Sequence, residues 1–372
     1  MKPKLLIDSI SLMSSLTGIG RYTYEVSKKL KKIESFEIEY FYGYYSTDLM
    51  KSSTKIGIKN LKSTIAKNPF IKQIARKFLT LSSRLFGKKY DLYWQPNFIP
   101  NSGIKANKIV TSVHDFSFIL HKDFHLKESI AYFENNFFQN LYRSDMIITG
   151  SNYSKQEILE RTNFTEDKIR VIYHGIDHNL FKVYQDIELN FELPSKFILS
   201  VGTVEPRKNL LGLLKAYNLL DEQLKKEYKL ILVGFKGWEN SEIMELMNQN
   251  KESIEYLGFI SDEELAKVYN LATCFLFPSF YEGFGLPPLE AMACGTPVVS
   301  SNSSSLPEVG GDAVVYCDPY SIEDIKNKIE MVLINSELQQ TMVSKGLKQA
   351  KKFSWEKSAQ EHKELFDEVL NS

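Results

Sequence analysis

The stretch from 279 to 300 (SFYEGFGLPPLEAMACGTPVVS) sets two carboxylates around a pair of glycines and a pair of prolines. Glu282 stands just before Gly283 and Gly285, and Glu290 follows the prolines. Glycines let backbone amides approach a ligand closely, and prolines suit the first turn of a helix, whose free amides bind anions. Carboxylates accept hydrogen bonds from sugar hydroxyls. A pyrophosphate between two sugar-type groups would use all these features, so the stretch predicts a site for such a ligand.

The alternative for this stretch is a plain strand–turn–helix, in which Glu282 faces solvent and Glu290 complements the helix dipole. Two glutamates alone would favour that alternative. The glycines and prolines around the pair favour the binding site instead.

A second motif, GTVEPRKN from 202 to 209, also follows an apolar run and opens a predicted helix. It begins with Gly202 and carries two cations, Arg207 and Lys208. Arginine offers a planar fork of donors and lysine a compact charge, which together suit a diphosphate. A solvated basic turn is the alternative. The position after a buried strand favours binding, because ligands of open α/β sheets lie at the carboxyl ends of strands.

The first half of the chain offers looser candidates. His114 follows the strand-like run 108–113, so we expect its side chain to point into a cleft as an acid/base group. A structural histidine is the alternative at such a position. Gly18 and Gly20 follow the first strand in a predicted loop that could cradle phosphate, although the full glycine series of a dinucleotide site is absent.

Alternating strands and helices position these motifs, which predicts α/β domains with parallel sheets. The first half has predicted strands at 4–8, 38–42, 108–113 and 146–149, with helices at 22–32 and 129–142. The second half has predicted strands at 197–201, 230–233, 254–257, 274–277 and 296–300, with helices at 210–220, 241–250, 262–272 and 287–294. We predict a first domain over 1–180, a second over 181–353 and a helix in 354–372 that either simply ends the chain or returns to the first domain.

The composition is that of a globular protein, and we expect it in the cytoplasm. Hydrophobic residues make up 43% of the 372 residues, and 46 basic residues balance 46 acidic ones, which gives no sign of nucleic-acid binding. We see no signal-peptide core and no apolar run long enough to span a membrane. Cys274, Cys294 and Cys317 form no Cys-x-x-Cys motif, so we expect no disulfide framework and no zinc site.

Together these motifs resemble those of the retaining GT-B glycosyltransferases of family four (group 1), over nearly the whole chain. The Glu282-x7-Glu290 pair is similar to the hallmark of that family, as are EPRKN at 205–209 and SLPEVGGDA at 305–313. GIGRYTY at 18–24 is similar to the start of its members. The likeness leans toward bacterial polysaccharide mannosyl- and rhamnosyltransferases.

The resemblance implies two Rossmann-like domains facing across a cleft, and a role for each candidate. Arg207 and Lys208 would hold the donor diphosphate and stabilise charge on the leaving group. Glu282 would contact hydroxyls of the donor sugar, and Glu290 the ribose. His114 would contact the donor sugar near the reacting carbon. The remaining donor-binding candidates are Gly18, Gly20, Gly202, Gly283, Phe284, Gly285 and Leu286.

The implied reaction retains the anomeric configuration and needs no metal or other cofactor; the sequence has no Asp-x-Asp motif. It works by positioning the reactants, by stabilising the leaving group and by excluding water on closure. We expect a nucleotide-sugar donor, with GDP-mannose favoured and UDP-hexose or UDP-N-acetylhexosamine open. The acceptor would be a saccharide or lipid-linked saccharide of a cell-surface polysaccharide. Two alternatives stay open: a UDP-sugar epimerase of the same architecture, and a nucleotide-sugar-binding protein without catalysis.

The segment 51–89 stands out because it carries nine lysines, two arginines and no acidic residue. Its apolar residues recur at helical spacing, which is typical of a basic amphipathic helix. Such a helix either lies on an anionic membrane surface, here the inner face of the cell membrane, or packs on the first domain with its charges in solvent. The sequence supports both interpretations equally.

Overall fold

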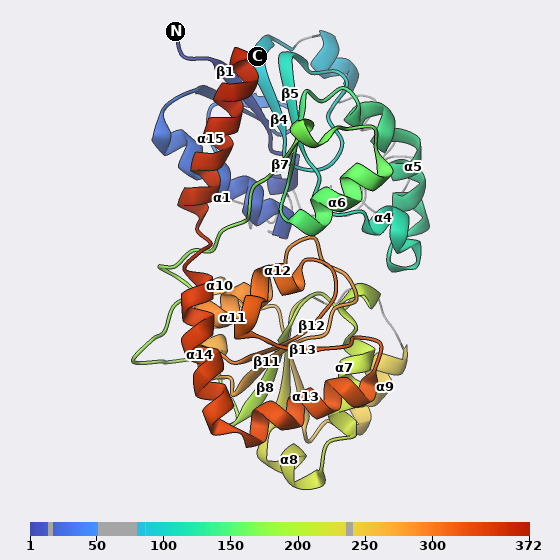
Figure 1. Cartoon of the computed structure of the whole chain (residues 1–372), viewed down its shortest axis with the longest axis vertical. Helices are drawn as coiled ribbons and strands as arrows, with labels where there is room; N and C mark the ends of the chain where they lie inside the picture. The colour runs from blue at the N-terminus through green and yellow to red at the C-terminus, as the bar shows by residue number, and fades with distance from the viewer. Residues whose placement is uncertain (14–17, 51–79, 86, 236–240) are drawn as a thin grey trace. The chain divides into compact units, whose positions relative to one another are not determined.

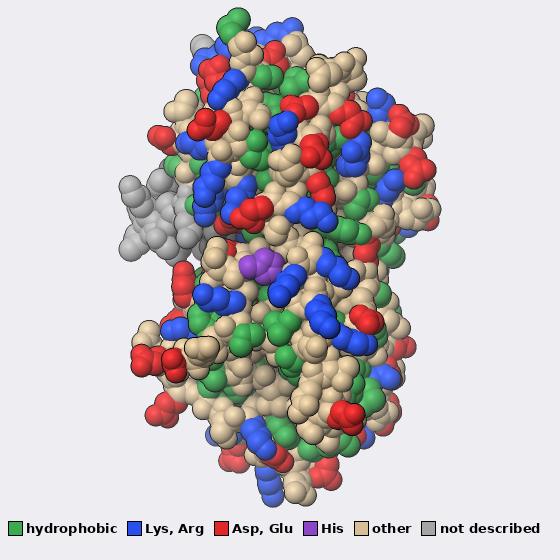
Figure 2. Space-filling view, turned by 60° about the vertical axis from the view of Figure 1, so that its left-hand side comes forward, with side chains coloured by type: hydrophobic (Ala, Val, Ile, Leu, Met, Phe, Trp, Pro, Cys, Tyr) green, Lys and Arg blue, Asp and Glu red, His purple; other side chains and the backbone are tan. Residues whose placement is uncertain are grey.

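The computed structural model describes residues 1–13, 18–50, 80–85, 87–235 and 241–372. The chain forms two compact units: unit 1 is Met1–Gly175 with Trp355–Ser372, and unit 2 is Ile176–Ser354. The sequence analysis predicts domain limits between residues 180 and 181 and between residues 353 and 354. The basic segment 51–89 lies largely outside the described residues. On the face shown in Figure 2, acidic and basic side chains are interspersed, in keeping with the formal net charge of zero.

Unit 1, as far as it is described, is built on a seven-stranded sheet in the order β3-β2-β1-β4-β5-β6-β7 (Figure 1). Neighbouring strands are parallel except that β3 pairs antiparallel with β2. The strands are β1 (Lys4–Asp8), β2 (Glu37–Phe41), β3 (Tyr45–Ser46), β4 (Lys89–Gln95), β5 (Lys105–Ser112), β6 (Met146–Thr149) and β7 (Ile169–Val171). The helices are α1 (Gly18–Ile33), α4 (Ser117–Leu120), α5 (Lys127–Leu141), α6 (Asn152–Arg161) and α15 (Trp355–Asn371).

Helix α15 brings the end of the chain back to unit 1, where it packs against α1, β4 and β5. Figure 1 shows it in red alongside the blue α1. Its apolar face is buried, including Trp355, Ala359, Leu365 and Val369, which recur at helical spacing. The sequence leaves open whether this helix simply ends the chain or returns to the first domain. The structure shows that it returns to unit 1.

Unit 1 differs from the sequence prediction in several details, and β3, β7, α4 and α6 add to the predicted elements. Gly18 and Gly20 do not lie in a loop, because α1 begins at Gly18 and both glycines belong to its first turn. Strand β4 was not predicted, because its alternating polar residues interrupt the apolar run. Tyr93 and Trp94 of β4 are fully buried in the core of unit 1.

Unit 2, among its described residues, has a six-stranded parallel sheet in the order β10-β9-β8-β11-β12-β13. The strands are β8 (Phe197–Val201), β9 (Lys229–Val233), β10 (Ile254–Gly258), β11 (Cys274–Phe277), β12 (Val298–Ser301) and β13 (Val315–Cys317). The helices are α7 (Leu210–Asn218), α8 (Glu222–Glu227), α9 (Ser241–Gln249), α10 (Asp262–Leu271), α11 (Leu286–Ala293), α12 (Leu306–Gly310), α13 (Ile322–Ile334) and α14 (Ser336–Ala350). The predicted strands and helices of this half are confirmed, and β13, α8, α12, α13 and α14 add to them.

The central strands β8 and β11 are neighbours, and both are followed by a predicted binding motif. Because they run parallel, both motifs emerge at the same edge of the sheet. Strand order thus brings together residues that are about seventy positions apart in the chain.

Candidate active site

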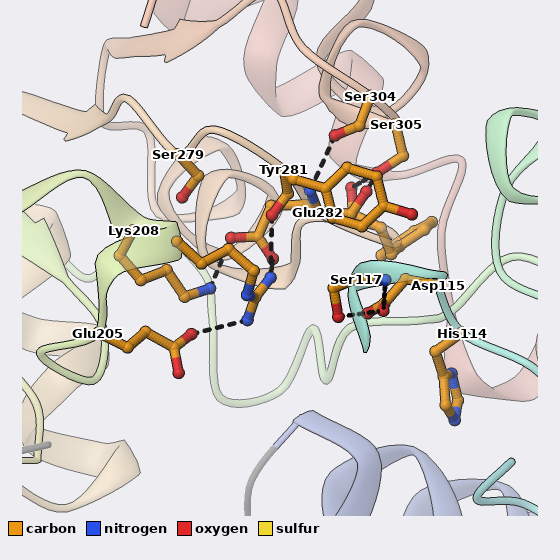
Figure 3. A network of polar contacts seen from close by, with 12 residues as sticks. His114, Asp115, Ser117, Glu205, Lys208, Ser279, Tyr281, Glu282, Ser304 and Ser305 are labelled. Carbon is orange, nitrogen blue, oxygen red and sulfur yellow. Dashed lines mark hydrogen bonds and ion pairs between the residues drawn. The ribbon is translucent and has the colours of Figure 1, made fainter. Parts of the chain in front are cut away.

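The structure joins the two motifs of unit 2 through one carboxylate. Oε2 of Glu282 lies 2.6 Å from Nη1 of Arg207, and Oε1 lies 2.6 Å from Nζ of Lys208. Nη2 of Arg207 also donates to Glu205, at 2.8 Å. We call these four residues the charged cluster; Figure 3 shows Glu205 and Lys208 coming from one loop and Glu282 from another. The solvated basic turn and the solvent-facing Glu282 are therefore both excluded, since Glu282 is buried and the side chains of Arg207 and Lys208 are only 19% and 17% exposed.

Asn209 fixes the loop that carries the two cations. It has a left-handed backbone (φ 55°), and its side-chain oxygen accepts from the amide of Gly212, so it caps α7. Its Nδ2 donates to the carbonyls of Pro278 and Pro319, at 3.1 and 2.7 Å. One buried amide thereby ties together the segments that follow β8, β11 and β13. The sequence motif contained Asn209, but no local signal showed these distant partners.

Two serines fix the loop that carries Glu282. The amide of Glu282 donates to Oγ of Ser304, at 2.8 Å, and Oγ of Ser305 donates to the carbonyls of Glu282 and Phe284. The glycine turn ends at Gly285, whose φ of +115° disfavours any other residue. Leu286 then begins α11, with Pro287 and Pro288 in its first turn. Ser305 belongs to a motif of the family resemblance, yet its anchoring role appears only in the structure.

Within the charged cluster, burial and the attraction between opposite charges shift the pKa values of Glu282 and Lys208 in opposite directions. Burial alone raises the pKa of Glu282, but the adjacent Arg207 and Lys208 cations bring its pKa below the usual value. Burial lowers the pKa of Lys208, as does the Arg207 charge, while the ion pair with Glu282 opposes them. Glu282 is therefore an ionised carboxylate that compensates two cations.

Glu290 lies inside α11 and is buried. Its Oε2 accepts a hydrogen bond from the hydroxyl of Tyr269, at 3.3 Å. This burial argues against a glutamate that only complements the helix dipole from the surface. Its predicted contact with a ribose stays a prediction.

A hollow opens beside Lys208, lined in part by Gly202, Leu210, Tyr256 and Phe277. Gly202 lies directly after β8, and the aliphatic part of Lys208 packs near it. The Lys208 ammonium lies 5.0 Å from the centroid of the Phe277 ring. This hollow lies at the carboxyl end of β8 and borders the Lys208 side chain.

His114 of unit 1 has a different environment. It is buried among aromatic rings, with Tyr22 and Phe98 edge-on at 5.2 and 5.4 Å between centroids. Its Nε2 lies 2.8 Å from the carbonyl of Pro96, so that nitrogen carries the proton and donates. Burial lowers the pKa of His114. The ring is thus held as a neutral imidazole, and its predicted catalytic role stays a prediction. Figure 3 shows it with its neighbour Asp115, which accepts two hydrogen bonds from Ser117.

Three buried histidines surround Tyr22: His114, His174 and His362. We call these four residues the histidine cluster. The Tyr22 hydroxyl lies 2.7 Å from Nε2 of His362, whose Nδ1 donates to the carbonyl of Ser358 at 2.7 Å. That donation makes Nε2 the acceptor, so Tyr22 donates to it. Burial lowers the pKa of His362 to about 4. The link holds α15 to α1 across 340 positions of the chain, and no sequence signal predicted it.

Within the described part of the chain, no three side chains of His, Cys, Asp or Glu are grouped in a way that could hold a metal ion. No helix of that part is both apolar enough and long enough to cross a membrane. Independence from metal therefore stays a prediction.

The halves of the chain match two family models: "Glycosyltransferase Family 4" over residues 16–180, and "Glycosyl transferases group 1" over residues 185–349. The chain is 34% identical to O-antigen chain mannosyltransferase B of Escherichia coli, over 95% of this chain and 96% of that protein.

Solved structures show the same fold at low identity. Sucrose-phosphate synthase from Thermosynechococcus elongatus has a TM-score of 0.71 at 19% identity, with 100% of both chains covered. Anabaena HepE in complex with UDP and glucose has a TM-score of 0.69 at 16% identity, with 99% of this chain and 100% of that chain covered. The predicted GT-B fold is confirmed. The chain therefore belongs to the group 1 glycosyl transferases of family 4 and is a glycosyltransferase.

Proposed function

We propose that this enzyme transfers mannose from GDP-mannose to a saccharide or lipid-linked saccharide, with retention of anomeric configuration, during synthesis of a cell-surface polysaccharide. The observation that carries the proposal is the charged cluster, where two cations converge on one carboxylate beside an open hollow. A donor diphosphate is the ligand whose charge and size suit this pair of cations. The 34% identity to an O-antigen chain mannosyltransferase supports mannose as the sugar.

In this proposal the residues of unit 2 act on the donor. Arg207 and Lys208 bind the diphosphate and stabilise the negative charge that develops on the leaving group. Glu282 then accepts hydrogen bonds from hydroxyls of the donor sugar, and Glu290 from the ribose. His114 contributes a neutral imidazole to the donor sugar. No residue is proposed as a covalent nucleophile and no metal is required.

The test begins with thermal stabilisation by GDP, UDP, ADP and dTDP, each with and without EDTA. A ligand that binds the folded protein raises its melting temperature. A shift with GDP alone that EDTA does not change supports the proposal, whereas a shift with UDP alone contradicts the GDP donor. UDP is a necessary comparison, because Anabaena HepE was solved with UDP and glucose. NMR of the product made from GDP-mannose then reports whether the α-anomeric configuration is retained.

The two alternatives predict other products. An epimerase would convert a free UDP-sugar without an acceptor, and a binding protein without catalysis would bind the donor without turnover. Membership of a glycosyltransferase family favours transfer over both.

Membrane association is a separate part of the proposal, and it places the enzyme on the cytoplasmic side of the cell membrane. It rests on the basic composition of 51–89 and on two leucines one turn apart near the end of this segment: Leu81 and Leu85 are 54% and 64% exposed. Flotation with anionic and with neutral liposomes tests it. Binding to anionic vesicles only, lost when lysines of 51–77 are reversed to glutamate, supports docking; no flotation with either vesicle contradicts it.

A further inference from the structure

Ser279 presents a buried hydroxyl without a partner. The residue is 0% exposed, and among the described residues its Oγ has no hydrogen-bond partner. Its backbone is held in place, because Oγ of Ser301 donates to the Ser279 carbonyl at 2.6 Å. A buried hydroxyl without a partner costs about 1–3 kcal/mol, so such a group in a functional loop calls for an explanation.

The position of this hydroxyl suggests its use. Ser279 lies two residues after β11, in the loop that carries Glu282, and Figure 3 shows it beside the pair of Lys208 and Glu282. Each oxygen of the Glu282 carboxylate faces one cation, Oε1 toward Lys208 and Oε2 toward Arg207. The two cations together compensate most of the charge of this carboxylate.

A bound donor changes that balance, and this step rests on the proposed function. A nucleoside diphosphate group brings negative charge that competes with Glu282 for the same two cations. A buried carboxylate that loses its cations is costly unless other donors replace them. Hydroxyls of the donor sugar can donate hydrogen bonds to one oxygen of the carboxylate. The protein must then provide a hydrogen-bond donor for the other oxygen.

We propose that Ser279 is a positioning residue of the donor site: its hydroxyl donates to Glu282 when Arg207 and Lys208 turn to the diphosphate, and it holds that carboxylate toward the donor sugar. The exchange involves hydrogen bonds and ion pairs only. It explains why this loop buries a serine hydroxyl beside the Glu282 carboxylate.

The electrostatics of Glu282 agree with such a contact. Burial raises its pKa, and Arg207 and Lys208 lower it most strongly; the nearby Ser279 hydroxyl is a smaller influence in the same lowering direction. Once the cations are engaged elsewhere, this smaller effect gains weight in keeping Glu282 ionised.

The experiment compares Ser279→Ala with Ser358→Ala, in melting temperature and in steady-state kinetics with GDP-mannose and a saccharide acceptor. Ser358 is a matched control, because its hydroxyl is also buried and has no partner in the described part of the chain, but it lies on α15 of unit 1. We expect neither variant to melt below the wild type without donor, because each loses an unpaired buried hydroxyl. Ser279→Ala alone lowers kcat, by about tenfold, the worth of one hydrogen bond to a charged group.

The pH dependence of kcat separates positioning from simple packing. Without the Ser279 hydroxyl, Glu282 of the donor complex holds its proton to higher pH, so the acidic limb of kcat moves upward in Ser279→Ala and stays in place in Ser358→Ala. Wild-type kcat and an unmoved acidic limb in Ser279→Ala overturn the inference, as does a melting temperature well below that of Ser358→Ala. Failure of the wild type to turn over any nucleotide-sugar overturns the proposed function and this inference together.

Discussion

The charged cluster of unit 2 and the histidine cluster of unit 1 both bury titratable groups, but they control charge in opposite ways. In the charged cluster, cations hold Glu282 ionised despite its burial. In the histidine cluster burial lowers the pKa of each histidine, and this effect outweighs the others, so all three rings are neutral at pH 7. Ionised groups suit a site that must hold a diphosphate, whereas neutral rings suit a packed region that keeps its geometry.

The largest expected effect is on Lys208. We expect Lys208→Ala to lower kcat/KM by roughly 10²-fold or more, because it removes a charge that stabilises the leaving group. Lys215→Ala is the control, since Lys215 forms a surface ion pair with Glu242 and should leave steady-state kinetics unchanged. Near-wild-type kinetics for Lys208→Ala would remove this residue from the site.

Glu282→Ala should also lower turnover by roughly 10²-fold, and it tests the role of Glu282 as a counter-ion. Without ligand the variant leaves the Lys208 ammonium without its carboxylate, so the free energy of unfolding should fall, by about 2 kcal/mol for a pair that is partly exposed. Saturating GDP should narrow the gap to the wild type, because phosphate supplies the missing charge. Melting temperatures with and without GDP measure this, and an unchanged gap would mean that the diphosphate does not meet these cations.

The histidine cluster should make unit 1 sensitive to acid. The pKa of His362 is near 6.5 in the unfolded chain and about 4 in the folded one, so the unfolded chain binds more protons between these values. Its contribution to stability is complete above pH 6.5 and is lost as the pH falls toward 4, by at most about 3 kcal/mol. His174, with its lowered pKa, acts in the same direction.

The comparison of wild type with His362→Phe isolates this effect. Asp8, whose pKa burial raises to about 6, titrates in the same window with the opposite sign in both proteins and cancels in the difference. Denaturant unfolding followed by tryptophan fluorescence in a Trp238→Phe background reports on unit 1 through the two remaining tryptophans, Trp94 and Trp355. Equal pH slopes between pH 4 and 6.5 in the two proteins would contradict a neutral buried His362.

The smallest expected effect is the absence of a titration. Because burial lowers the pKa of His114, the wild-type profile of kcat/KM should show no acidic limb near pH 6.5 from this residue. The profile of His114→Gln, an uncharged variant that still offers a side-chain donor to Pro96, is the comparison. A limb near pH 6.5 that disappears in His114→Gln would show that the imidazole titrates in this range, which would remove the contrast between the two clusters.

The sequence by itself determined the strands and helices of unit 2 and the place of both binding motifs. Buried parallel strands are continuous apolar runs, and a motif that follows such a run must emerge at the carboxyl edge of the sheet. Arg207, Lys208 and Glu282 could therefore be selected from their local context. Unit 1 was predicted less completely, since the mixed composition of β4 hides a central strand.

Only the tertiary structure decided how distant residues pair. Glu282 serves both cations because strand order places β8 beside β11, and Ser305 anchors the Glu282 loop from a helix that follows a third strand. Helix α15 reaches unit 1 and places His362 against Tyr22, a contact that spans 340 positions. The burial that keeps the three histidines neutral also results from this long-range packing. Local sequence sets the residue types and the ends of the strands, whereas charge state depends on neighbours that long-range packing alone provides.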